Sequence, residues 1–409
     1  MATKRLSDDT SLKNKDIFRT STGLASAAIP NTPTIGIATA TGSSTATVTY
    51  TAATLGATAT SFTATSSPGS VTGTGSSPIT VSGLTGETNY TFTVTATNAN
   101  GTSVASSASN SITTLSSNHT GATWTSFSLP RSQGWSAIRS NGTRFVALAS
   151  DSIYGATSTD GINWTEITLP AAMTNANVAW NGTIWLALGY YGANTSNGSG
   201  IATSTNGVTW TARLKPDNYN ATHALAAKGS TFANQGTNQG RTFITTDGIN
   251  FTTGSASAFG WWGMAANSSI YVAPTYYGNT VFGVSTDGLN WTNYNAPTGQ
   301  DQFDIAWNGS LFASPAYNSS VIQTSPDGQT WTNRTLPSSS TWSGIASAGS
   351  NFVTIATNSS SVATSSNGIT WTARTLPSTG NVQDTCIASL NGVFVAISSG
   401  SATAYRSTS

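Results

Sequence analysis

Between residues 30 and 115, short stretches of alternating polar and apolar residues are separated by turns that contain Gly and Pro. Examples are TATVTY at residues 45–50 and SFTAT at residues 61–65. An alternation with period two places the apolar side chains on one face of an extended strand, and the turn residues favour hairpins. The pattern predicts an antiparallel β-sandwich for this part of the chain.

The rest of the chain repeats a longer pattern. Six times a Ser/Thr-rich strand leads into an Asp-Gly or Asn-Gly turn and then an aromatic residue, from STDGINW at residues 158–164 to SSNGITW at residues 365–371. The copies lie about forty residues apart, and this period predicts a radial array of β repeats. The Asx and aromatic positions of the six turns are Asp160 and Trp164, Asn206 and Trp210, Asp247 and Phe251, Asp287 and Trp291, Asp327 and Trp331, and Asn367 and Trp371.

Each repeat divides into four strands, which in one copy lie near residues 342–347, 352–357, 362–365 and 370–376. Four short strands per repeat are typical of a β-propeller blade. The pattern of the first two strands occurs seven times, but the seventh copy has no fourth strand. A strand of that form, GATWTSFSLP at residues 121–130, precedes the first repeat. We therefore expect a seven-bladed propeller whose last blade is completed by this N-terminal strand, which would remove the open sheet edges.

The sandwich segment carries a more specific pattern. Leu84 is followed six residues later by Tyr90, and Phe92, Val94 and Ala96 then alternate along one strand. In these positions the segment resembles the second half of a fibronectin type III domain of the bacterial and phage kind. The resemblance implies that Tyr90 forms the corner that ties a loop of one sheet to the other, and that the domain acts as a spacer or weak binding module.

The sequence thus predicts an all-β protein with four segments: an extended arm at residues 1–29, the fibronectin type III-like sandwich at 30–115, a linker at 116–120 and the propeller at 121–409. The cations that we expect to anchor the arm to a particle are Lys4, Arg5, Lys13, Lys15 and Arg19.

The repeated turn resembles the Asp box of sialidase-like propellers, in a form one residue shorter. Its Asp or Asn can accept hydrogen bonds from the backbone N–H groups of its own turn, and its aromatic ring can pack between neighbouring blades. We therefore interpret all six turns as structural.

Ligand-binding residues are expected on the opposite face. In a four-stranded blade the turns between strands one and two and between strands three and four share one face, which we call the turn face. The remaining connections form the loop face, and here they vary in length and are rich in Tyr, Asn and Gly. Flat aromatic rings beside amides and hydroxyls suit sugars or a protein contact. The candidates are Trp135, Tyr154, Tyr190, Tyr191, Tyr219, Trp261, Tyr276, Tyr277, Tyr317 and Trp342.

Catalysis is not expected. Three equivalent arginines, Arg213, Arg334 and Arg374, fall on outer strands around the rim, whereas a sialidase needs three that converge. A glycosidase needs two carboxylates a few ångströms apart, and the best candidates are Asp301, Asp304 and Asp384. The two histidines and the lone cysteine, His119, His223 and Cys386, do not suggest a metal site. We predict no enzyme activity, no metal and no cofactor.

Charged residues make up 7% of the chain and the net charge is +1, so there is no electrostatic basis for binding nucleic acid. The start MATKRLSDDTSL resembles the starts of tailed-phage structural and fibre proteins, and residues 1–18 lack the apolar segment of a secretory signal.

We expect a virion surface protein, made in the host cytoplasm and present in several copies per particle. Its arm would dock on other virion proteins, and its propeller would bind a host-surface glycan or a neighbouring virion protein. The alternatives are a capsid or tail decoration that binds no receptor, and a glycoside hydrolase of the sialidase-like type.

Overall fold

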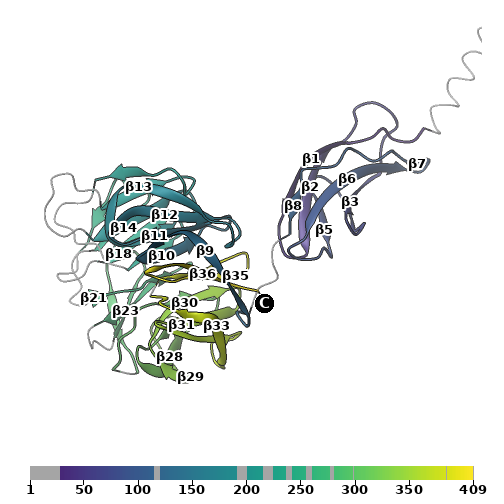
Figure 1. Cartoon of the computed structure of the whole chain (residues 1–409). Helices are drawn as coiled ribbons and strands as arrows, with labels where there is room; N and C mark the ends of the chain where they lie inside the picture. Colours follow the sequence, from purple (N-terminus) through teal and green to yellow (C-terminus); the bar gives the residue numbers. More distant parts are fainter. Residues whose placement is uncertain are drawn as a thin grey trace, which may run out of the picture. The chain divides into compact units, whose positions relative to one another are not determined.

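The computed structural model describes residues 28–114, 120–190, 200–214, 224–235, 242–254, 260–276, 281–297, 299–383 and 385–408, with only the backbone of Tyr190 and Tyr276. Figure 1 shows the two compact units, residues 1–117 and 118–409. Every regular element in these ranges is a β-strand, in agreement with the all-β prediction. The predicted anchoring cations lie outside the described residues.

The first unit contains two antiparallel sheets. One has the order β1-β2-β5, and the other has the order β4-β3-β6-β7 with β8 also paired to β6. Apolar residues from both sheets, among them Val48, Val81, Phe92 and Val94, form a shared core. The strands are β1 (Thr34–Ala40), β2 (Thr45–Thr51), β3 (Ser61–Ser67), β4 (Thr72–Thr74), β5 (Ile79–Ser82), β6 (Asn89–Asn98), β7 (Gly101–Thr102) and β8 (Ile112–Thr113).

Tyr90 lies at the start of β6 and is buried together with Leu84. Its hydroxyl oxygen accepts a hydrogen bond from the backbone N–H of Thr85, at 3.0 Å. This bond ties the segment that follows β5 to the strand of the other sheet, which is the corner contact that the Leu-Tyr spacing predicted.

The second unit consists of antiparallel sheets in which consecutive strands pair. Four-stranded sheets are formed by β17–β20, β26–β29, β30–β33 and, with β9 as the outer strand, by β34–β36. Strands β21–β25 form a further sheet, and β10–β16 form a seven-stranded sheet in which the long β13 pairs on both sides. The repeat at residues 342–376 is one of the four-stranded sheets, as predicted.

The first half of the second unit contains β9 (Trp124–Gln133), β10 (Trp135–Ser140), β11 (Phe145–Ala149), β12 (Ser152–Ser158), β13 (Thr165–Trp180), β14 (Trp185–Tyr190), β15 (Ile201–Ser204), β16 (Thr211–Arg213), β17 (Leu225–Lys228), β18 (Thr231–Gln235), β19 (Thr242–Thr245), β20 (Thr252–Thr253), β21 (Gly260–Trp261) and β22 (Ala265–Ala266). The second half contains β23 (Tyr271–Tyr276), β24 (Val281–Ser285), β25 (Thr292–Asn295), β26 (Ala306–Trp307), β27 (Phe312–Pro315), β28 (Ser319–Ser325), β29 (Thr332–Ser340), β30 (Trp342–Ala348), β31 (Asn351–Ala356), β32 (Ser359–Ser365), β33 (Thr372–Gly380), β34 (Ile387–Leu390), β35 (Val393–Ile397) and β36 (Ser401–Ser407).

The sheets are arranged in a closed ring. The inner strands contact one another in succession, from β10 through β13, β17, β22, β26, β30 and β34 back to β10. The outer edge closes as well, because β9 pairs antiparallel with β36. The N-terminal strand therefore completes the last sheet, which is the pairing that the sequence predicted.

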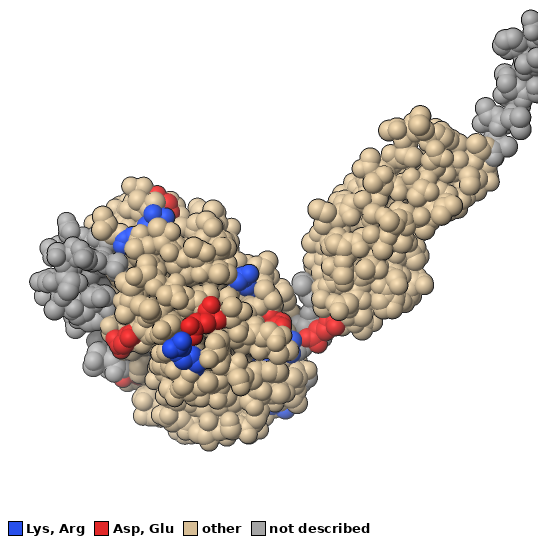
Figure 2. Space-filling view, turned by 45° about the horizontal axis from the view of Figure 1, so that its top comes forward, with Lys and Arg blue, Asp and Glu red and all other residues tan. Residues whose placement is uncertain are grey.

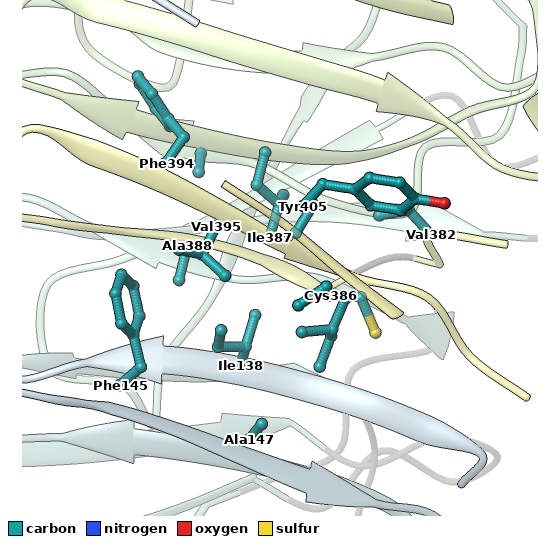
Figure 3. Close-up of a cluster of buried hydrophobic side chains, with 14 of the residues drawn as sticks. Ile138, Phe145, Ala147, Val382, Cys386, Ile387, Ala388, Phe394, Val395 and Tyr405 are labelled. Carbon is teal, nitrogen blue, oxygen red and sulfur yellow. The ribbon is translucent and has the colours of Figure 1, made fainter. Parts of the chain in front are cut away.

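The seam between the last and first sheets has its own apolar core. Figure 3 shows Ile138 and Phe145, on strands of the first sheet, close to Ile387 and Val395 of the last sheet. Polar contacts reinforce the seam: the Ile138 N–H donates to the Thr385 carbonyl at 2.9 Å, and the Thr385 hydroxyl donates to the Ser136 carbonyl at 2.6 Å. The ring is therefore held at its seam by both apolar packing and hydrogen bonds.

The six Asx-Gly turns share one hydrogen-bond pattern. In the first turn, Asp160 Oδ1 accepts from the backbone N–H groups of Ile162 and Asn163, both at 2.8 Å, and the Ser158 hydroxyl donates to the same oxygen at 2.9 Å. Asn206 and Asn367 make the equivalent backbone bonds through their amide oxygens. The Asx side chains are thus engaged within their own turns.

The turn glycines and aromatics fill the space between sheets. A Cβ on Gly161, which has φ +74°, would lie 2.6 Å from Val395 of the neighbouring sheet, so only glycine fits this close approach. Trp331 stacks on Phe282 of the preceding sheet with ring centroids 3.5 Å apart. The turn motif therefore has a packing role as well as a local one.

A partial copy of this motif introduces β9, with Trp124 forty residues before Trp164. Gly121 has φ +73°, and a Cβ there would meet Val353 of the neighbouring sheet. Trp124 Nε1 donates to the Gly121 carbonyl at 2.8 Å, just as Trp331 Nε1 donates to the Gly328 carbonyl at 2.9 Å. The sequence has Asn118 and Thr120 at the Ser and Asx positions, so only the glycine and the aromatic of the motif are kept.

A disulfide at the end of the β9–β36 pair should stabilise the ring. The hydroxyl oxygens of Thr123 and Thr408 lie 2.8 Å apart, so the double variant T123C/T408C should form an intramolecular bond. Cross-linking such distant residues should stabilise the propeller by about 2–4 kcal/mol. Denaturant unfolding with and without reductant measures the difference. The single variant T408C is the control, and equal stability of the oxidised and reduced double variant would contradict the closure.

The turn carboxylates should make the stability depend on pH. Burial alone would raise the pKa of Asp287, but hydrogen bonds from Asn290 and Leu289 outweigh it and lower the pKa to about 2. Its contribution is therefore present above the unfolded value of 3.8 and is lost as the pH falls towards 2. D287N keeps the backbone bonds, as Asn206 does, and should lose less than about 1 kcal/mol at pH 7.

Urea unfolding of wild type and D287N at several pH values tests this expectation. The difference between the two proteins should shrink between pH 3.8 and about 2, where the wild-type carboxylate becomes protonated. The reverse variant N206D is the matched control and should gain stability at pH 7 that disappears over the same acid range. A deficit of D287N that stays constant down to pH 2 would show that the charge plays no part.

Candidate functional site

The antiparallel pairing fixes which connections share a face. The hairpin turns after the inner strands and all six Asx-Gly turns lie on the turn face, and the remaining connections lie on the loop face. The predicted binding residues belong to the loop face. Their side chains, however, do not all reach its surface.

For three of the predicted ligand-binding residues the prediction is wrong, because their side chains are buried. Trp135, Trp261 and Trp342 are at most 1% exposed. Trp135 Nε1 donates to the Ser401 carbonyl at 3.0 Å, and Trp342 Nε1 donates to the Ser338 carbonyl at 3.2 Å. These rings are core side chains because inner-strand positions of their register point between the sheets, so they offer no face to a ligand.

The predicted tyrosines have different outcomes. Tyr154 is half-buried, and the Arg131 guanidinium lies 3.9 Å from its ring centroid. Arg131 lies in β9 and pairs with Glu166 at 2.9 Å. Tyr317 is half-buried between β27 and β28. The remaining predictions fall on residues or side chains outside the described part of the structure: Tyr190, Tyr191, Tyr219, Tyr276 and Tyr277.

Tyr317 belongs to a cluster of aromatic side chains on the loop face, which we call the loop-face cluster: Trp262, Phe303 and Tyr317. The ring centroids of Phe303 and Tyr317 are 4.6 Å apart, and those of Phe303 and Trp262 are 5.7 Å apart with the rings edge to face. All three side chains are half-buried. Sequence reasoning missed Trp262 and Phe303, although the pair Trp261-Trp262 gave a signal, since adjacent strand residues point to opposite sides.

A backbone hydrogen bond joins the segments that carry Phe303 and Tyr317. The backbone N–H of Tyr317 donates to the Asp301 carbonyl at 2.9 Å, which joins the loop after β27 to the segment before β26. Gln302 is 3% exposed, and its Nε2 donates to Gln323 Oε1. Gln302 Oε1 is buried and has no hydrogen-bond partner among the described residues. The rings of the loop-face cluster offer an apolar surface suited to a ligand that carries C–H groups.

A second feature is a cavity of about 230 Å³ in the channel between the inner strands. Its wall residues come from β10, β26, β30 and β34 and from the segment around β22. Several wall residues lie at the ends of the inner strands, next to the hairpin turns. Each is the last or the second-to-last residue of its strand: Arg139, Ser140, Trp307, Ser347 and Ser389. The cavity therefore occupies the turn-face half of the channel.

Asp304 lies in the wall of this cavity and is 1% exposed. Its Oδ1 accepts from the Ile305 N–H at 2.9 Å, and its Oδ2 accepts from the N–H groups of Ile345 and Thr385 at 3.2 and 3.4 Å. Burial raises the pKa of Asp304, although the nearby Arg139 and these hydrogen bonds act in the opposite direction. One carboxylate thus joins three neighbouring sheets.

The carboxylates and arginines considered for catalysis have different surroundings. Asp304 is bound by backbone amides, Asp301 lies in the loop-face segment, and Asp384 is outside the described residues. The arginines of the outer strands point into their own sheets: Arg213 Nε donates to Thr203 at 2.8 Å, and Arg334 Nε donates to Thr324 at 3.4 Å. Figure 2 shows how few charged side chains reach the surface in that view.

Within the described ranges, no group of three or more His, Cys, Asp or Glu residues could hold a metal ion. In the same part of the chain, no helix has the length and hydropathy needed to cross a membrane.

Comparison with known proteins identifies the fold. No family model matches the chain, and no curated protein matches it. Among solved structures, a streptogramin B lyase is similar with a TM-score of 0.59 and 12% identity, over 69% of this chain and 96% of that one. YCF48 from Cyanidioschyzon merolae is similar with a TM-score of 0.52 and 13% identity, over 70% and 98% of the two chains.

A third similar structure is the β-propeller domain of Cps50 (Swd1) from Myceliophteria thermophila, with a TM-score of 0.52 and 9% identity, over 70% of this chain and all of that one. The covered share is close to the share of the chain that the second unit occupies. The second unit is a β-propeller. At such low identity the likeness shows the fold alone, so the activities of these proteins say nothing about this propeller.

Asp304 should be important for the stability of the propeller. D304A would leave three buried N–H groups without an acceptor and should lower the free energy of unfolding by at least about 2 kcal/mol. Since burial raises the pKa of this carboxyl, ionisation opposes folding. The cost of its charge should therefore appear as the pH rises above 3.8, and D304N should remove it.

Chemical denaturation at several pH values measures both effects, with D301A as the control on the same segment. Stability of D304A equal to that of D301A would contradict the role of Asp304. A pH dependence unchanged in D304N would contradict its ionisation in the folded protein.

Proposed function

We propose that this protein is a non-enzymatic virion surface protein of a tailed phage, and that the loop face of its propeller binds a host-surface glycan. The observation that carries the binding role is the loop-face cluster. Phe303 packs against both Trp262 and Tyr317, and the three half-buried rings form a preorganised apolar surface. The C–H side of a sugar ring can pack on such rings.

The contrast between the two propeller faces supports this assignment. In the Asx-Gly turns of the turn face, the Asx side chains accept hydrogen bonds from the backbone of their own turn, as Asp160 and Asn206 do. The connections of the loop face differ in length and carry the aromatic cluster. Variable connections on a rigid scaffold are the usual place for a binding site.

The proposal includes a finer architecture. We infer seven blades, because the seven-stranded sheet contains two overlapping sets of four strands that share β13. We infer that the first unit is a fibronectin type III domain, which the Tyr90 to Thr85 bond favours, and that the turns are shortened Asp boxes. In this arrangement residues 1–29 dock on other virion proteins, the sandwich is a spacer, and several copies raise the avidity of weak sites.

Binding to a glycan microarray of bacterial surface polysaccharides tests the function, with the full chain labelled by a fluorophore. Wild type should bind a subset of the glycans, and the double variant W262A/Y317A should lose at least about tenfold in signal, because stacking anchors carry much of the affinity. The matched control is W180A, since Trp180 is also half-buried but lies before a hairpin turn of the turn face.

Each result decides between the alternatives. Equal loss in W180A and in the double variant would indicate a general defect in folding and would refute the role of the cluster. If wild type binds no glycan but particles lacking the protein lose integrity, the protein is a decoration protein instead. Release of free sugar from a polysaccharide would make it a hydrolase.

A further inference from the structure

The turn-face half of the propeller channel has the features of a second binding site, whose wall contains none of the three residues of the loop-face cluster. Its wall at the level of the hairpin turns is formed by Ser140, Ser347 and Ser389, together with Trp307 and Arg139. These five side chains are half-buried, whereas Ile305, Ile345 and Ile387 deeper in the wall are buried. The cavity is therefore accessible from the turn face.

The three serines have a fixed hydrogen-bond direction. The Ser140 hydroxyl donates to the Ser389 carbonyl, the Ser389 hydroxyl donates to the Ser347 carbonyl, and the Ser347 hydroxyl donates to the Trp307 carbonyl. Each bond joins one sheet to the next. Because the hydroxyl protons are used in this way, the oxygen lone pairs remain to accept hydrogen bonds from a ligand.

Arg139 supplies the complementary donors. Its Nη1 donates to the carbonyls of Ile138 and Thr385, at 2.9 and 3.0 Å, and this fixes the guanidinium in the wall. Its Nε and Nη2 have no hydrogen-bond partner among the described residues, and Arg139 forms no ion pair with any of them. Nε and Nη2 together form the edge of a guanidinium that binds a carboxylate in a bidentate manner.

Asp304 does not cancel this charge by pairing with it. Its two oxygens are bonded to the backbone N–H groups of Ile305, Ile345 and Thr385, and Arg139 acts on its carboxylate through its charge, without a hydrogen bond. The rest of the wall is apolar and small, with Ala306, Ala346 and Ala388 facing the cavity. The volume of about 230 Å³ is below the range of sites for drug-sized ligands, so only a small molecule fits.

We propose that this cavity binds a small hydroxylated carboxylate, such as a sugar acid. Its carboxylate lies on the Nε and Nη2 edge of Arg139, its hydroxyls donate to the serine oxygens, and its C–H groups contact the alanine wall. The site is independent of the glycan-binding role of the loop face, and either can be wrong without the other.

Isothermal titration of the full chain with four probes tests the chemistry: glucuronate, glucose, acetate and inorganic phosphate. Glucuronate should bind more tightly than glucose, which lacks the carboxylate, and more tightly than acetate, which lacks the hydroxyls. R139Q should weaken glucuronate at least about tenfold and leave glucose unchanged, since a hydrogen bond between charged groups is lost. The control is K228Q, because Lys228 is a turn-face cation outside the cavity wall that binds the carbonyls of Ser269 and Thr286.

A second variant keeps the test decisive if R139Q does not fold. A346L leaves Arg139 in place and fills the cavity from the wall, so it should abolish glucuronate binding while the melting temperature confirms folding. Absence of saturable glucuronate binding to wild type, or wild-type affinity in A346L, would overturn the proposal. Phosphate binding as tight as glucuronate binding would also overturn it, because it would show that the site selects ligands by negative charge alone. Loop-face variants should bind glucuronate normally.

Discussion

The structure of the propeller depends on the pairing of β9 with β36. Without this pairing the last sheet would have only three strands and an exposed edge, and the contacts of β9 with β33 and β13 in the neighbouring sheets would be lost. The seam core around Ile138 and Ile387 requires both sheets to be in place. Closure also forms the channel, because a channel exists only when the inner strands surround it on all sides. Both proposed sites therefore rest on a strand that belongs, in sequence, to the other end of the unit.

Much of this closure could be predicted from the sequence, because it depends on local signals that repeat. The Asx-Gly turns, the period of about forty residues and the displaced strand at residues 121–130 each follow from turn chemistry or from strand alternation. Trp124 fits the same period, but the role of Gly121 beside it does not follow from the sequence. The Ser and Asx positions hold Asn118 and Thr120, and the positive φ and the shared Trp to Gly bond reveal the partial motif.

The binding residues were predicted less well, for a physical reason. A Trp at the start of an inner strand can point between the sheets or into the loop face, and composition does not distinguish the two. Trp261 and Trp262 are adjacent, yet the first is buried and the second is half-buried in the cluster. Asp304 presented the same difficulty: the sequence made it a candidate acid, whereas the fold surrounds it with amides from three sheets.

The two propeller faces differ in how far the side chains of a binding site also serve the fold. On the turn face, the serine hydroxyls, Asp304 and Arg139 bond to backbone atoms of neighbouring sheets, so any site there is made from the same contacts that hold the ring. On the loop face, Phe303 packs against Trp262 and Tyr317. The loop-face cluster lies in connections that vary in length from sheet to sheet, whereas a ligand preference built into the channel is tied to closure of the ring. Such a division suits a protein that must keep one scaffold while the surface it recognises varies.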